Sequence, residues 1–182
     1  MQDARTAIVE WAKWAVDSKR KFNYTEGSTR MSAIGVWPPA NAIFADCSAF
    51  VTWCYWMAKA DDPNGQNYDH EGYTGTLLSN GTKITLAEVQ PGDVIVYGPG
   101  TGWHTALIVE AGKDPLTVSH GQQGDPSYCR VSQDGRQPQT YLRFHTGIAG
   151  TPRTPADLPP ALAKPFHFGN FIKALGFSGK NA

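Results

Sequence analysis

Residues 45–57 (ADCSAFVTWCYWM) carry the hydrophobic pattern of a buried helix. The apolar side chains recur at the i, i+3, i+4, i+7 spacing of one helix face: Phe50, Trp53, Cys54 and Met57. Asp46 is a favoured N-cap residue, so the pattern predicts that Cys47 lies in the first turn.

The predicted position of Cys47 has a chemical consequence. Backbone N–H groups at the start of a helix have no intrahelical partner, and the helix dipole is positive there. Both effects favour the thiolate, which is the nucleophilic form of cysteine. The alternative is that Cys47 is a small buried hydrophobic residue. This segment alone leaves both interpretations open.

The flanking patterns predict an α+β domain, with N-terminal helices packed on an antiparallel sheet. Residues 4–20 have the pattern of an amphipathic helix. Residues 22–45 are rich in Gly, Pro and polar side chains, which predicts an irregular loop at one wall of a cleft. A short helix is expected at residues 74–79, within a second Gly-rich loop. Strands are expected at residues 93–97, 104–110, 116–120, 128–131 and 140–145.

The C-terminal part of the chain differs in composition. Residues 147–165 are rich in proline, which predicts a linker or an extended arm laid on the surface of the domain formed by residues 1–146. Residues 166–182 are rich in phenylalanine. An apolar tail of this kind needs a partner, either this domain or another chain.

Composition excludes several classes of partner and site. The 182 residues include 16 basic and 16 acidic side chains, which does not favour nucleic acid or an anionic membrane as a partner. No apolar run is long enough to span a membrane, and the first residues do not resemble a signal peptide. The three cysteines form neither a disulfide framework nor the spacing of a structural zinc site.

Two histidines are candidates to accompany Cys47. If the strands around Gly112 form a hairpin centred on that glycine, opposed residues have numbers that sum to 224. His104 then lies opposite His120 on one face, whereas Ser119 points to the other face. This arrangement supplies a nucleophile, a base in His104 and an orienting residue in His120.

Two other interpretations of these residues stay open. Cys47, His104 and His120 also form a possible zinc ligand set. Alternatively, the domain is an interaction module with an inactive site. Catalysis predicts a partly exposed Cys47 with a low pKa, whereas an inactive site predicts no reaction with an alkylating agent. His70, His145 and His167 are interpreted as structural residues.

The chain resembles the NlpC-type cysteine peptidases of bacterial cell walls, which have a papain-like α+β fold. The motifs are D-C-S-A-F-V at 46–51, P-G-D-V at 91–94 and H-T-A-L-I-V at 104–109. His120 falls where the family has its third polar residue. The resemblance spans about residues 20–145.

The resemblance implies hydrolysis of amide bonds in peptidoglycan stem peptides, without a cofactor. Cys47 is then the nucleophile, His104 the base and His120 the orienting residue. The expected oxyanion or substrate contacts are Tyr24, Asp46, Ser48 and Trp103. An N-acetylmuramoyl-L-alanine amidase of the CHAP type is the alternative enzyme.

Further similarity implies a phage origin. The aromatic run 53–56 and the Trp103-His104 pair resemble the peptidase domains of lysins from actinobacterial phages. Such a protein is made in the host cytoplasm without a signal peptide and reaches the wall through a holin or on a virion. The Phe-rich tail is then a docking segment for a phage protein or a second domain. The non-enzymatic alternative is a phage structural or tail component with a vestigial site.

Overall fold

A computed structural model describes residues 3–18, 21–122, 124–147, 151–160 and 162. Its centre is a sheet of six strands in the order β3-β8-β4-β5-β6-β7, with every neighbouring pair antiparallel. The strands are β3 (Thr82–Ile84), β4 (Val94–Tyr97), β5 (His104–Glu110), β6 (Leu116–Gly121), β7 (Gly124–Arg130) and β8 (Gln139–Arg143). The predicted α+β architecture is confirmed.

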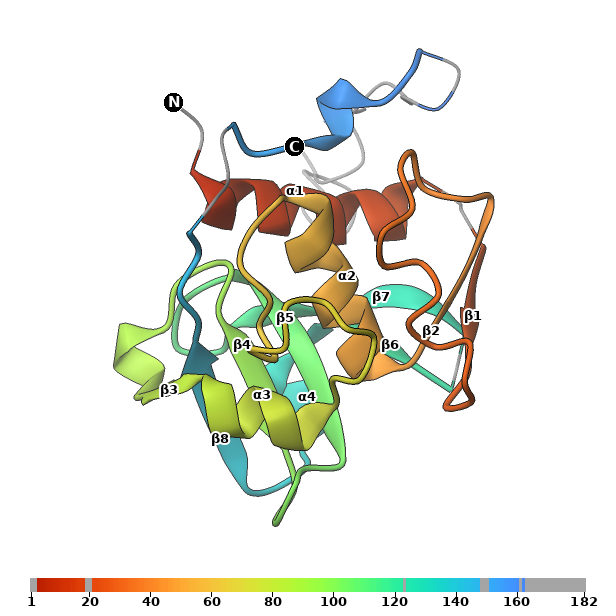
Figure 1. Ribbon diagram of the computed structural model, residues 1–182. Coiled ribbons are helices and arrows are strands. Elements are labelled where there is room, and N and C mark those ends of the chain that lie inside the picture. The colour runs from red at the N-terminus through yellow and green to blue at the C-terminus, as the bar shows by residue number, and fades with distance from the viewer. Residues whose placement is uncertain (1–2, 19–20, 123, 148–150, 161, 163–182) are drawn as a thin grey trace, which may run out of the picture.

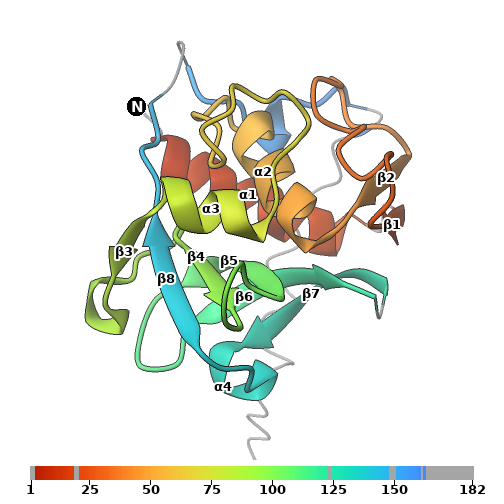
Figure 2. The same ribbon diagram turned by 60° about the horizontal axis from the view of Figure 1, so that its bottom comes forward.

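Helices cover both faces of the sheet. The longer helices α1 (Ala4–Asp17) and α2 (Cys47–Met57) lie together on one face (Figure 1), and their apolar side chains form the main core with that face. The short helix α4 (Val131–Asp134) lies on the opposite side (Figure 2). There Val131 closes a smaller core with Ile95, Ala106 and Ile108.

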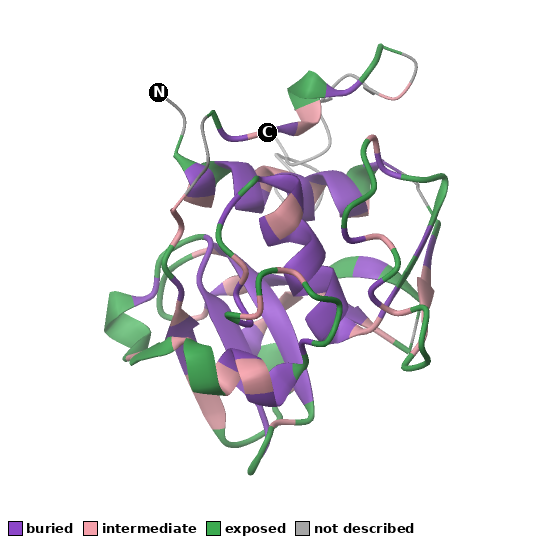
Figure 3. Cartoon of the chain, viewed as in Figure 1, coloured by how far each residue is buried: buried purple, intermediate pink, exposed green. Residues whose placement is uncertain are grey.

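Helix α2 forms as its sequence predicts. The Asp46 side chain accepts a hydrogen bond from the Ala49 backbone N–H at 2.7 Å, which caps the first turn. Nearly the whole helix is buried between α1 and the sheet (Figure 3). Cys54 is fully buried, so it packs as a small apolar residue.

Helix α1 also matches its prediction through Asp17, and Asp3 caps it by accepting from the Thr6 backbone N–H at 2.8 Å. Trp11 is fully buried and contacts Trp53 of α2 edge-to-face, with ring centroids 5.9 Å apart. These aromatic contacts join the two helices into one layer.

The region predicted to be an irregular loop contains two strands. β1 (Lys21–Tyr24) pairs in parallel with β2 (Ala42–Ala45), so the prediction was wrong at both ends of the range 22–45. Each strand buries one large side chain, Phe22 or Ile43. Four-residue strands give too short a pattern to be recognised within Gly- and Pro-rich sequence.

The shorter elements follow the expected order. α3 (Thr74–Asn80) confirms the short helix predicted near residues 74–79. The strand β3, the helix α4 and the single-turn helices η1 (Leu86–Glu88) and η2 (Pro155–Asp157) were not predicted.

The predicted register of the hairpin between β5 and β6 was wrong by one residue. Leu107 lies opposite Val118 and Ile108 opposite Thr117, so opposed numbers sum to 225 there. An irregularity between Ile108 and Glu110 shifts the pairing again at the turn. Because side chains alternate between faces, this register puts His104 and His120 on opposite faces of the sheet.

The described part of the Pro-rich segment contacts the rest of the chain. Residues 151–160 run along α1 (Figure 1), and the Trp11 Nε1–H donates to the Arg153 carbonyl at 2.7 Å. The Arg153 guanidinium lies between the Trp37 and Trp56 rings, 4.2 and 4.9 Å from their centroids. The Phe-rich tail at 166–182 lies outside the described residues. None of the described helices has the length and apolar character needed to cross a membrane.

Candidate active site

Cys47 occupies the first turn of α2, as predicted, but it is not exposed. Only 7% of its surface is accessible. The Thr105 backbone N–H, next to His104, is close enough to the sulfur to lower the pKa of the thiol. The sulfur therefore lies beside the start of β5.

The environment of Cys47 favours the thiol. Burial and the nearby Asp46 carboxylate raise the pKa of the Cys47 thiol to about 11. The backbone N–H groups of Thr105, Ser48 and Cys47 lower this pKa, but they do not outweigh burial. The expectation of a partly exposed cysteine with a low pKa was therefore wrong for the free protein.

His104 is held on two sides. Its Nε2 lies 2.5 Å from the Ser119 hydroxyl oxygen, and the Tyr97 ring on β4 stacks on the imidazole with a centroid distance of 6.0 Å. Burial, followed by the positive charge of Arg136, lowers the pKa of His104 to about 4. The Arg136 guanidinium lies 5.6 Å from the centroid of the Tyr97 ring. His104 is therefore neutral at pH 7.

His120 lies in an aromatic enclosure on the other face of the sheet. The rings of Phe22, Tyr24 and Phe50 surround it at centroid distances of 5.9, 5.6 and 6.0 Å. Neither ring nitrogen has a hydrogen-bond partner among the described residues. The structure therefore does not place His120 as a hydrogen-bonded partner of His104, contrary to the predicted hairpin.

Tyr24 and Trp103 flank the site in different ways. Burial raises the pKa of the Tyr24 hydroxyl most, followed by its hydrogen bond to Glu26 and by the nearby Cys47. That hydroxyl donates to the Glu26 carboxylate at 2.8 Å. Trp103 is 65% exposed. It packs over Gly98, where a Cβ would lie 2.6 Å from the indole.

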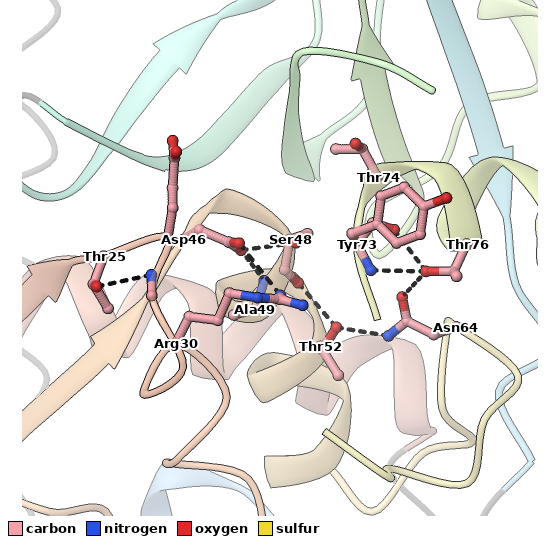
Figure 4. Close-up of polar contacts among 12 residues, drawn as sticks. Thr25, Arg30, Asp46, Ser48, Ala49, Thr52, Asn64, Tyr73, Thr74 and Thr76 are labelled. Atoms are coloured by element: carbon pink, nitrogen blue, oxygen red, sulfur yellow. Dashed lines mark hydrogen bonds and ion pairs between the residues drawn. The ribbon is translucent and has the colours of Figure 1, made fainter. Parts of the chain in front are cut away.

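Asp46 and Ser48 begin a chain of hydrogen bonds that runs from α2 to α3 (Figure 4). The Ser48 hydroxyl donates to Asp46 at 2.7 Å, and the Ser48 carbonyl accepts from Thr52 at 2.9 Å. Asn64 donates to the Thr52 hydroxyl at 2.9 Å and accepts from Thr76 at 2.7 Å. These two site residues therefore have structural roles at the start of α2.

Arg30 supplies a positive charge at the same helix start. Its guanidinium lies 3.3 Å from Oδ2 of Asp46, whereas Oδ1 of the same carboxylate caps the helix. The Asp46 carboxylate thus has three kinds of partner: a cation, a hydroxyl and a backbone N–H.

A cleft of about 780 Å³ is lined by α1, the turn at 90–91, Val109 and residues 155–156, away from these residues. Its lining includes Arg5, Val9, Lys13, Pro91 and Pro155, and no predicted site residue. Within the described ranges, no group of three or more His, Cys, Asp or Glu side chains is arranged to hold a metal ion.

Sequence reasoning missed Ser119 as a partner of His104, because the assumed register pointed it to the other face. It also missed Tyr97 and Arg136. Tyr97 lies opposite His104 on the neighbouring strand. The only sequence signal for these contacts is strand register, which a single sequence specifies poorly when the hairpin contains an irregularity.

The solved structures that superpose on this chain are NlpC/p60 domains, so the chain has the papain-like α+β fold of that class. One is RipB, a peptidoglycan hydrolase of Mycobacterium tuberculosis, with a TM-score of 0.51 and 26% identity, covering 79% of this chain and 67% of that one. Another is the NlpC/p60 domain of the peptidoglycan hydrolase SagA, with a TM-score of 0.54 and 20% identity, covering 77% and 98%.

The sequence comparison agrees with the structural one. RipB, named as a peptidoglycan endopeptidase, is 26% identical over 117 residues. The match covers 64% of this chain but 44% of RipB, so the chain spans less than half the length of this curated relative. No protein-family model matches the chain.

Proposed function

We propose that this chain is a cysteine endopeptidase that hydrolyses amide bonds in the stem peptides of peptidoglycan. One observation carries the proposal: Cys47 begins a buried helix with its sulfur beside the start of β5, where His104 is held by Ser119. The similarity to RipB, a peptidoglycan endopeptidase, supports the choice of substrate.

In this proposal, proton transfer accompanies attack. Cys47 is a thiol and His104 is neutral at pH 7, so His104 takes the thiol proton as the sulfur adds to the carbonyl carbon. The Cys47 backbone N–H, unpaired in the helix, supports the oxyanion. The imidazolium returns the proton to the leaving amine as the C–N bond breaks. Water then attacks the thioester, giving its proton to His104, and the thiol is restored as the acid leaves.

Trp103 and Tyr24 are proposed contacts for the substrate. Trp103 follows the turn that leads into β5 and presents an exposed indole directly before His104. Tyr24 approaches Cys47 from β1. Its hydroxyl proton is engaged by Glu26, so Tyr24 must release Glu26 before it donates to an oxyanion.

The test is mass spectrometry of purified peptidoglycan after digestion by the wild type and by Cys47→Ala. The wild type is expected to split the stem peptide, and the variant to leave it intact. Identical digests would refute the catalytic proposal. A free lactyl group on the sugar would instead identify an amidase.

We further propose that the chain acts on the wall as part of a phage lysin or virion. This proposal rests on the resemblance of residues 53–56 and 103–104 to actinobacterial phage lysins. Expression in an actinobacterial host with and without a holin tests it. Lysis that requires both the holin and Cys47 is expected, whereas lysis independent of the holin contradicts the lysin route.

A further inference from the structure

The identity of the group that orients His104 depends on the register between β5 and β6. Leu107 opposite Val118 puts Thr117 and Ser119 on the face of β5 that carries His104. The two cores agree with this alternation: Ala106 and Ile108 belong to the smaller core, and Leu107 and Val118 to the main one.

Ser119 is the polar side chain in contact with the imidazole. The distance of 2.5 Å between His104 Nε2 and the Ser119 oxygen is a short hydrogen bond. Tyr97 stacks on the imidazole at an interplanar angle of 24° and limits the ring rotation that a single hydrogen bond still allows. His104 is therefore fixed by one hydrogen bond and one stacking contact.

His120 offers no equivalent contact. It is fully buried, and its ring nitrogens have no hydrogen-bond partner among the described residues. Burial lowers the pKa of His120 more than the nearby backbone of Gly124, Ala45 and Asn23 raises it. The imidazole is therefore neutral at pH 7 and packs among Phe22, Tyr24 and Phe50.

We propose that Ser119, and not His120, is the positioning residue of His104, in an inference that rests on the proposed peptidase function. The Ser119 oxygen accepts the Nε2–H, so that Nδ1 carries the lone pair that receives the Cys47 proton. In the first step the S–H bond breaks, an N–H bond forms at Nδ1, and the sulfur electron pair forms the bond to the carbonyl carbon. The π pair of the C=O bond moves to the oxygen, which becomes the oxyanion. No proton passes to Ser119.

A hydroxyl in this position has a specific electrostatic consequence. Unlike a carboxylate, it accepts the Nε2–H of the proposed tautomer without adding a negative charge that stabilises the imidazolium. Burial lowers the pKa of His104 most, Arg136 lowers it further, and Asp134 and Asp46 raise it. His120 is uncharged at pH 7 and lowers this pKa only when it is itself protonated. The site therefore keeps the cysteine and the histidine uncharged before substrate binds.

Nitrogen-15 NMR of the histidine rings tests the contact directly in the full chain. The wild type is expected to show His104 protonated at Nε2, Ser119→Ala to show mixed tautomers, and Ser119→Thr to restore the wild-type state. His120→Gln is the matched variant on the same strand. It is expected to lower the melting temperature without changing the His104 tautomer.

Kinetics on purified peptidoglycan separates positioning from folding. Ser119→Ala is expected to lower kcat about 10- to 100-fold with KM little changed. Ser119→Asp is expected to move the acidic limb of the kcat profile to higher pH, because a carboxylate raises the pKa of His104.

The positioning role of Ser119 and the peptidase activity can be refuted independently. If Ser119→Ala keeps the tautomer and the kcat while His120→Gln changes both, Ser119 is not the positioning residue, and the peptidase proposal stands. If wild type and Cys47→Ala give identical digests, the peptidase proposal fails. The NMR measurement then still decides whether Ser119 fixes the His104 ring.

Discussion

At the scale of single residues, Cys47 shows how burial competes with a helix N-terminus. The unpaired N–H groups of the first turn stabilise a thiolate, as the sequence suggests. Burial and the Asp46 charge raise the pKa of the thiol and prevail. The reason is that the free energy of hydration that a buried thiolate loses exceeds the stabilisation that a few backbone N–H groups provide. The same Asp46 that starts the helix thus opposes ionisation of the nucleophile.

Alkylation kinetics test the protonation state of Cys47. In a Cys129→Ser background, iodoacetamide is expected to modify Cys47 at a rate that rises about tenfold per pH unit up to the pKa of about 11. The modified site is identified by peptide mass spectrometry. A rate that levels off below pH 8 would show that the thiolate is already stabilised in the free protein.

Asp46→Asn is expected to lower the pKa of Cys47, because it removes the negative charge while an asparagine still caps the helix. The same alkylation profile measures the shift. Asp46→Ala is the control: it removes the charge equally but also the cap, at a cost of about 1 kcal/mol in the free energy of unfolding. An Asp46→Asn profile identical to that of the wild type would contradict the electrostatic argument.

At the scale of elements, the P-G-D motif at 91–93 is explained by a buried ion cluster. The Asp93 side chain is fully buried and is paired with Arg5 of α1 at 2.5 Å and Arg143 of β8 at 2.8 Å. It also accepts from the Gln90 backbone N–H at 2.8 Å. Through these ion pairs the motif connects α1 to the sheet, a structural role that the local sequence pattern does not indicate.

Asp93→Asn is expected to lower the free energy of unfolding by about 3–5 kcal/mol, because two arginines lose their buried counterion. Urea denaturation measures the change. Glu110→Gln is the matched control at the more exposed pair with Arg130, where a loss below about 1 kcal/mol is expected. Equal losses in the two variants would mean that burial of Asp93 is not decisive.

At the scale of the whole molecule, the arm at 151–160 is part of the packed structure. Leu158 is 5% exposed, and the arm joins α1, α2 and the loop that carries Trp37. The proposed domain boundary at residue 146 therefore separates segments of different composition that remain in contact.

Arg153→Met is expected to lower the free energy of unfolding by about 0.5–2 kcal/mol, because methionine keeps the apolar stem and loses the charge between the two tryptophans. Urea denaturation measures the loss, and Lys83→Met on the exposed β3 serves as the control for removal of a positive charge. No difference between the two variants would contradict a stabilising contact.

The whole molecule is also expected to lose stability in acid through His104. The pKa of this histidine is about 4 in the folded protein and 6.5 when unperturbed. The unfolded chain therefore binds the proton first, and the free energy of unfolding falls as pH drops from 6.5 towards 4. The loss is about 3 kcal/mol at most. Urea denaturation at several pH values should show that the free energy of unfolding depends less on pH in His104→Gln than in the wild type. The same pH dependence in both proteins would contradict a role of His104 in acid destabilisation.

The sequence by itself determined the long helices, the main strands and the order of Cys47 and His104, because these depend on periodicity, capping and short motifs. It also identified Cys54 as a packing residue. Only the tertiary structure decided the one-residue register of the hairpin, and with it that Ser119 contacts His104 while His120 packs among aromatic rings. It also decided the high pKa of Cys47. Register, burial and charge depend on atoms distant in sequence, which local patterns do not encode.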